Sequence, residues 1–167
     1  MRGMSDERVQ QITQVARGVR AEQAVAGADP ARAAPKHASD RTAIIEAMFL
    51  MAIVDGEVSK EEVRTFAAAV GRILGSVTAE QVEALLVEMT ASLEREGWET
   101  RLRGVSQALR GGAGAESAFR LATAVAFVDD HVTHSESAAL DALASGLEIA
   151  AERAHEIMSE VHRELFG

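Results

Sequence analysis

The acidic motif DGEVSKEE, at Asp55–Glu62, occurs a second time in this chain as DDHVTHSE, at Asp129–Glu136. Each copy follows an almost wholly apolar segment, at residues 43–54 and 119–128. We call these copies the first and the second acidic motif. One constant shift along the chain aligns them, so an aspartate, a short loop and a glutamate in the next helix recur. The repeat predicts a fold built from two related halves.

Composition places the chain among globular proteins. Its 167 residues suffice for one domain with a core, and 47% of them are apolar. Only 4% are aromatic, so the core must consist mainly of aliphatic residues and methionine, which is typical of closely packed helices. The chain has no cysteine, which excludes disulfides, a thiolate nucleophile and a cysteine-based zinc site.

Charge and hydropathy argue against several classes of protein. The formal net charge of −9 argues against nucleic-acid binding, which usually needs a basic surface. No apolar run approaches the roughly 20 residues of a transmembrane helix. Arg2 is not followed by the apolar stretch of a secretory signal. We therefore expect a cytoplasmic protein that does not bind nucleic acid, and the missing cysteines agree with this.

Residues 1–39 predict an amphipathic helix followed by a linker. Apolar residues recur at helical spacing between Ser5 and Val25. Both prolines of the chain, Pro30 and Pro35, follow in a segment rich in alanine and charge that has no periodicity. The apolar stripe of this helix is expected to be available to a partner or to a membrane surface.

Residues 40–167 predict one compact all-α domain, because no segment shows sustained strand alternation. The two halves cover about 42–95 and 115–165. Within them, the pattern predicts helices at 42–54, 59–74, 78–95, from Gly97-Trp98 to about 110, 115–128, 133–146 and 151–165. The helices at 42–54 and 115–128 are apolar nearly all round, so we expect them to pack against each other.

Three helix starts carry recognisable caps. Ser59-Lys60-Glu61-Glu62 and Thr78-Ala79-Glu80-Gln81 are capping boxes, and Thr133 with Glu136 repeats the pattern. Trp98, the single tryptophan, is expected to anchor the start of its helix in the core.

The repeated arrangement resembles the tellurite-resistance protein B family (TerB-like domains) over about residues 40–165. The residues that carry the resemblance are Ala52, Asp55, Gly56, Val58, Ser59 and Glu62, with Ala126, Asp129, Val132, Thr133 and Glu136. It implies an all-helical domain without established enzymatic activity, a role in bacterial stress and tellurite resistance, and acidic residues suspected of binding metal. Asp130 stands where the family usually has glycine, so the second loop must hold an aspartate in a left-handed conformation or take another path.

The acidic motifs have two readings, and the sequence leaves both open. In the first they bind a divalent cation, with candidate ligands Asp55, Glu62, Asp129, His131, His134 and Glu136. Carboxylates and water suit Mg²⁺, Ca²⁺ or Mn²⁺, while the two histidines suit Zn²⁺. In the second reading Glu62 and Glu136 only complete capping boxes, and Asp55 and Asp129 accept hydrogen bonds from loop amides.

Two charges lie inside the central helices at positions related by the repeat, Glu46 and Arg120. They would pair across a pseudo-twofold axis, or else stand as two independent solvated charges.

The sequence favours a non-enzymatic TerB-like module of the stress response that works through a protein partner and through a divalent cation. One alternative is a metal-dependent enzyme that uses Asp129, His131 and Glu136. Another is a purely structural interaction domain.

Overall fold

The structure is a computed structural model, and it describes residues 30–54, 64, 66–68, 70–71, 78–112, 114–127 and 132–167. These ranges contain helices α2 (Pro30–Ala52), α4 (Ala79–Glu96), α5 (Trp98–Leu109), α6 (Gly114–Phe127), α7 (His134–Gly146) and α8 (Ala151–Phe166). The described residues include no strand. The predicted all-α fold is confirmed.

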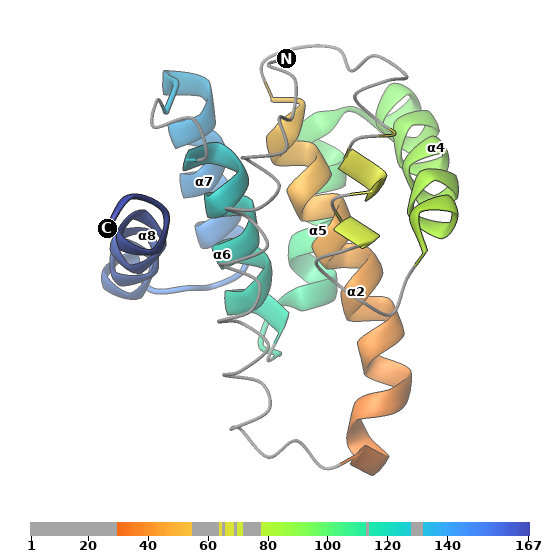
Figure 1. Cartoon of the computed structure of the whole chain (residues 1–167), viewed down its shortest axis with the longest axis horizontal. Coiled ribbons are helices and arrows are strands. Elements are labelled where there is room, and N and C mark those ends of the chain that lie inside the picture. Colours follow the sequence, from red (N-terminus) through yellow and green to blue (C-terminus); the bar gives the residue numbers. More distant parts are fainter. Residues whose placement is uncertain are drawn as a thin grey trace.

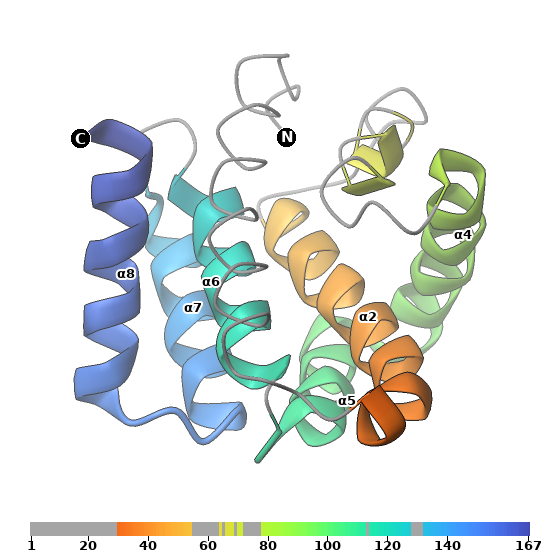
Figure 2. The ribbon, with the colours of Figure 1, turned by 60° about the horizontal axis from the view of Figure 1, so that its bottom comes forward.

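Helices α2 and α6 form the centre of the molecule. They make the most extensive contact of any two elements, α5 packs against α2, and α8 packs against α6 (Figure 1). In Figure 2, α4 and α8 lie on opposite sides of this central pair. The predicted packing of the two central apolar helices is therefore confirmed.

Small side chains allow α6 to lie deep in the core. Every residue of α6 is buried except Glu116, Val125 and Phe127. A Cβ atom on Gly114, the first residue of α6, would lie 3.2 Å from the Asp40 carboxylate of α2. This close approach favours glycine where the two central helices meet.

The predicted linker is wrong from Pro30 onward, because α2 already begins there. Pro30 suits the first helical position, where its missing N–H group has no intrahelical acceptor. Pro35 removes a hydrogen bond inside the helix, at a cost of about 3 kcal/mol, and therefore misled the sequence analysis. The division expected at residue 40 falls inside α2, and the helix predicted at 5–25 lies outside the described residues.

The other predicted helices agree with the structure within a few residues. The helix predicted at 59–74 is described only at 64, 66–68 and 70–71, which are helical. The correspondence between the two halves stays a prediction, since much of the first acidic motif and its helix lies outside the described residues.

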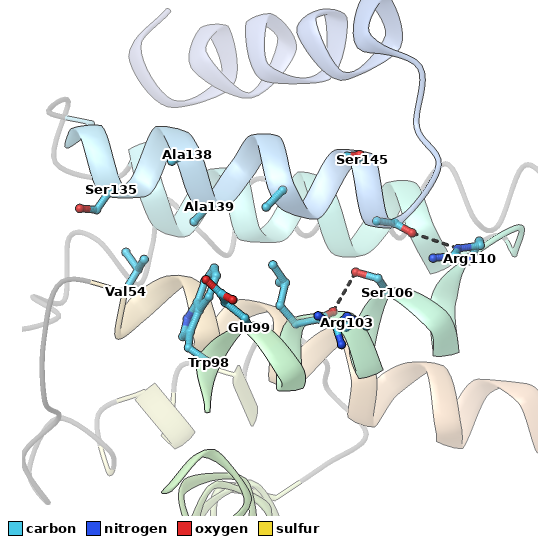
Figure 3. Close-up of a pocket in the computed structure, with 13 residues that line it drawn as sticks. Val54, Trp98, Glu99, Arg103, Ser106, Arg110, Ser135, Ala138, Ala139 and Ser145 are labelled. Atoms are coloured by element: carbon cyan, nitrogen blue, oxygen red, sulfur yellow. Dashed lines mark hydrogen bonds between the residues drawn. The ribbon is translucent and has the colours of Figure 1, made fainter. Parts of the chain in front are cut away.

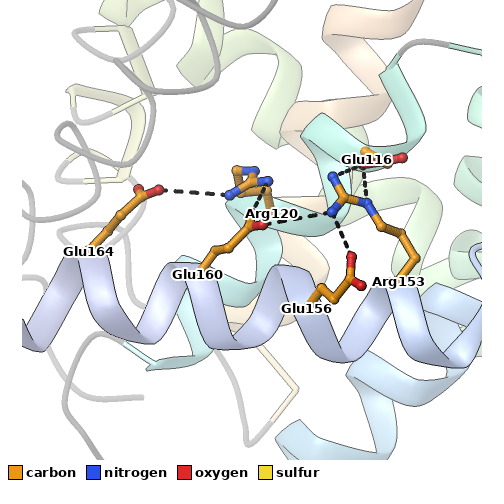
Figure 4. A network of polar contacts seen from close by, with 6 residues as sticks. All are labelled: Glu116, Arg120, Arg153, Glu156, Glu160 and Glu164. Carbon is orange, nitrogen blue, oxygen red and sulfur yellow. Dashed lines mark hydrogen bonds and ion pairs between the residues drawn. The ribbon is translucent and has the colours of Figure 1, made fainter.

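The two charges inside the central helices are buried and each has its own partners. Glu46 is paired with Arg101 of α5, with N–O distances of 2.5 to 3.1 Å. Arg120 lies 2.6 Å from Glu160 and 3.8 Å from Glu164, both on α8 (Figure 4). Both predictions for these charges, a Glu46–Arg120 pair and two independent solvated charges, are therefore wrong. Helix α5 brings an opposite charge to Glu46 of α2, and α8 brings opposite charges to Arg120 of α6.

A second arginine extends the ion pairs between α8 and α6. Arg153 of α8 lies 2.7 Å from Glu116 of α6, 3.0 Å from Glu156 and 3.7 Å from Glu160 (Figure 4). These contacts are at least a third exposed, so they fix the direction of α8 more than they stabilise the fold.

Candidate functional site

The structure describes the end of the second acidic motif and the residue before the first. Of the six candidate ligands, it places His134 and Glu136. The other four, Asp55, Glu62, Asp129 and His131, lie outside the described residues.

Thr133 and Glu136 form the predicted capping box at the start of α7. The Glu136 amide donates to Thr133 Oγ1 at 3.1 Å, and the Thr133 amide donates to Glu136 Oε1 at 3.4 Å. Thr78 and Gln81 make the same pair of bonds at the start of α4. Both boxes are confirmed, while the box predicted at Ser59 lies outside the described residues. The Glu136 carboxylate therefore has a structural role that needs no metal.

His134 is the first residue of α7 and is exposed. No three histidine, aspartate or glutamate side chains within the described residues are grouped so that they could hold a metal ion. His134 and Glu136 thus make no site without ligands from elsewhere. On α8, the His162 ring lies 5.0 Å from that of Phe166 and 6.4 Å from that of Phe127.

A groove of about 560 Å³ runs between α5 and α7 (Figure 3). We call it the α5–α7 groove. Its lining residues are Val54 after α2; Trp98, Glu99, Leu102, Arg103, Ser106 and Arg110 on the α5 side; and Ser135, Ala138, Ala139, Ala142, Ser145 and Gly146 on α7. No local sequence pattern predicts this groove, because only the packing of α5 beside α7 creates it.

The residue that precedes the first acidic motif and a residue of the second motif both line this groove. Val54 directly precedes Asp55, the first residue of the first motif, and Ser135 belongs to the second. Figure 3 shows Val54 and Ser135 at the same end, with Arg110 at the opposite end. Two segments far apart in sequence therefore meet at one end of the groove.

Trp98 fixes the end of α2 just before the first motif. Its indole Nε1 donates a 3.0 Å hydrogen bond to the carbonyl oxygen of Leu50, in the last turn of α2. Carbonyl groups in the last turn of a helix lack an intrahelical partner. The predicted anchor at the start of α5 is confirmed, and its hydrogen bond also holds the α2 terminus from which the first motif leaves.

Helices α5 and α7 approach each other closely at two residues that line the groove, Ser106 and Gly146. A Cβ atom on Gly146 would lie 2.5 Å from Ser106 Oγ and 2.9 Å from Ser106 Cβ. Ser106 is buried, and its hydroxyl donates to the Leu102 carbonyl at 2.8 Å. Residue 146 must therefore be glycine for the helices to approach this closely.

Two arginines of the α5 side line the groove, Arg103 near the middle of α5 and Arg110 just after its last residue. Arg110 Nε donates to the Gly146 carbonyl at 3.1 Å and lies 3.5 Å from the Glu148 carboxylate. Arg103 is exposed, and within the described part of the chain it makes no hydrogen bond or ion pair. The sequence holds one signal for this face of α5. Four of its lining residues recur at helical spacing and so lie on the same side of the helix: Glu99, Arg103, Ser106 and Arg110.

Comparison with protein-family models, with curated proteins and with solved structures finds no match. The resemblance to TerB-like domains rests on the residues of the repeated motif and stays a prediction. Each helix within the described ranges is too short or too polar to cross a lipid bilayer.

Proposed function

We propose that this chain is a non-catalytic, TerB-like helical module that binds a divalent cation through its two acidic motifs and acts on a protein partner. We place it in the bacterial cytoplasm, in the response to stress and to metal oxyanions such as tellurite. One observation carries the proposal: Val54 and Ser135, each joined to an acidic motif, line the same end of one groove.

Ligand chemistry supports a cation shared by the two motifs. His134 and Glu136 alone are too few ligands, and Asp55 is covalently joined to Val54 at the same end of the groove. Carboxylates from two loops, completed by water, suit Mg²⁺, Ca²⁺ or Mn²⁺. His131 and His134 add imidazole to the second motif, which favours Zn²⁺ there.

The groove lining supports a binding role over a catalytic one. Its described lining residues include no histidine, and the Ser106 hydroxyl donates to a backbone carbonyl and not to a base. A serine nucleophile needs a neighbouring base to become reactive. The remaining lining is mainly apolar or small, which suits association with another molecule.

Calorimetric titration of the full chain with Mg²⁺, Ca²⁺, Mn²⁺ and Zn²⁺ tests the proposal. We expect saturable binding of one ion per chain, lost in both Asp55→Asn and Asp129→Asn. The matched control is Asp141→Asn, an exposed aspartate on α7 outside the motif. Absence of binding at millimolar ion, or binding that survives both substitutions, would contradict it.

A further inference from the structure

The α5–α7 groove has two unlike walls. The α7 wall presents Ser135, Ala138, Ala142 and Ser145, which recur every three or four residues and carry only small side chains. The α5 wall is formed by larger and charged side chains, among them Arg103 and Arg110 (Figure 3). A wall of small residues lets the backbone of another helix approach closely.

The groove is lined by basic side chains, although the chain as a whole is acidic. The whole chain has a net charge of −9, yet the charged side chains that line the groove within the described residues are two arginines, Arg103 and Arg110, and one glutamate, Glu99. Among the described residues, Arg110 has one ion-pair partner, Glu148, in a contact whose side chains are 41% and 65% exposed. Such a surface pair holds its arginine weakly, so both guanidinium groups are accessible to an incoming carboxylate.

The length of the groove suits a helix. The α5 wall runs from Trp98 to Arg110, a rise of about 18 Å, which a helix of about 12 residues would match. Amphipathic helices commonly lay an apolar face into a groove between two helices. A carboxylate on such a helix would then meet Arg103 or Arg110 in a fork-shaped, bidentate contact.

We propose that the α5–α7 groove binds an acidic amphipathic helix of a partner protein, with the apolar stripe of that helix against α7 and its carboxylates on Arg103 and Arg110. This inference rests on the proposed function only in that the chain acts through a protein partner. It requires no cation, so the two proposals can fail separately.

Trp98 provides the readout, since it is the single tryptophan and lines the groove. The probe is a display library of helical peptides of about 16 residues, selected on the full chain, from which a synthetic peptide is titrated against Trp98 emission. We expect the selected peptides to be enriched in aspartate and glutamate on one flank and to shift the emission saturably. The shift should persist in chelator even if no cation is bound.

Three variants locate the contact. The Arg103→Glu/Arg110→Glu variant should weaken the acidic peptide by about tenfold or more and strengthen its lysine-substituted counterpart. Ala142→Phe should fill the groove and abolish the emission change. Arg95→Glu, an exposed change on α4 outside the groove, is the charge control and should leave binding unchanged.

Several results would overturn the proposal. They include selection of peptides without an acidic bias, failure to select any peptide, equal binding by the double arginine variant, and a Trp98 shift that appears only with anionic vesicles. A shift that grows with protein concentration in the absence of peptide would assign the groove to a second copy of the chain and would also overturn it.

Discussion

Glu46 of α2 and Arg101 of α5 form a bidentate ion pair in which the carboxylate is 7% exposed and the guanidinium 27%. Arg101 also donates to Glu96 at 2.9 Å. Glu46 raises the pKa of Arg101 further above its ordinary value through these hydrogen bonds. The pair fixes α5, and with it one wall of the groove, to the central helix.

Replacing Glu46 with alanine should lower the free energy of unfolding by about 1–3 kcal/mol, because the half-buried guanidinium of Arg101 loses its main partner and keeps only Glu96 among the described residues. Denaturation in guanidinium chloride measures the loss. The matched control is Glu83→Ala, which removes an exposed pair with Arg64 and should change stability by about 0.5 kcal/mol or less. Equal effects of the two substitutions would contradict a structural role for the Glu46–Arg101 pair.

Gly146→Ala should destabilise the protein by about 1–3 kcal/mol, since the new methyl group would collide with Ser106. Gly104→Ala is the control. Its Cβ would meet only Arg101 at 3.8 Å, and alanine in a helix is favoured by about 1 kcal/mol, so stability should rise. The Ser106→Gly change should recover part of the loss in the Gly146→Ala background. A neutral Gly146→Ala variant would show that α5 and α7 are not closely packed there.

The ion pair between α6 and α8 should make stability depend on pH. Arg120 donates a 2.6 Å hydrogen bond to Glu160 and holds the pKa of Glu160 below its ordinary value. The Glu160 carboxylate therefore binds a proton less readily in the folded state than in the unfolded chain. The resulting stability is present above about pH 4.5 and is lost as the pH falls through the folded pKa.

Glu160→Gln should accordingly lower the free energy of unfolding by about 1 kcal/mol near pH 7, a value discounted for the exposure of Glu160. The difference from the parent should shrink at acid pH, once the pH has fallen through the lowered folded pKa of Glu160 and its carboxyl group is neutral like the glutamine. Urea denaturation at both pH values checks this. A difference that is the same at both values would mean that the charge of Glu160 contributes nothing.

A glutamine substitution can separate a capping role of Glu136 from a role in metal binding. Gln81 performs the N3 role in α4, so Glu136→Gln should preserve the cap of α7 and change stability by less than about 0.5 kcal/mol. Thr133→Ala removes the N-cap oxygen and should cost about 1 kcal/mol. Calorimetry of Glu136→Gln with Mn²⁺ then reports on the ligand role alone. Undiminished binding would make Glu136 a capping residue only.

The sequence predicts most of the helical framework because its signals are local. Thr78 with Gln81 and Thr133 with Glu136 mark helix starts, and each forms the expected reciprocal bonds. Most of the apolar segment predicted at 115–128 is buried over its described residues, as its composition requires. Pro35 is the exception, since a proline usually interrupts a helix and α2 runs through it.

Partners far apart in the chain could not be predicted in the same way. Glu46 pairs with Arg101 and Arg120 with Glu160, because the helices that cover each central helix decide the partner. The groove residues Arg103 and Arg110 face α7 for the same reason. Only the arrangement of α5 beside α7 shows which exposed arginines share a surface.

The central claim is that the two acidic motifs meet at one end of the groove and act on the same cation. Paramagnetic line broadening by Mn²⁺ tests it most directly, observed by NMR at the amides of Val54, Ser135 and Ser145. We predict that the resonances of Val54 and Ser135 broaden together at the same ratio of Mn²⁺ to protein, while Ser145 near the opposite end is affected less. Broadening of only one of the pair, or of neither at millimolar Mn²⁺, would contradict the claim.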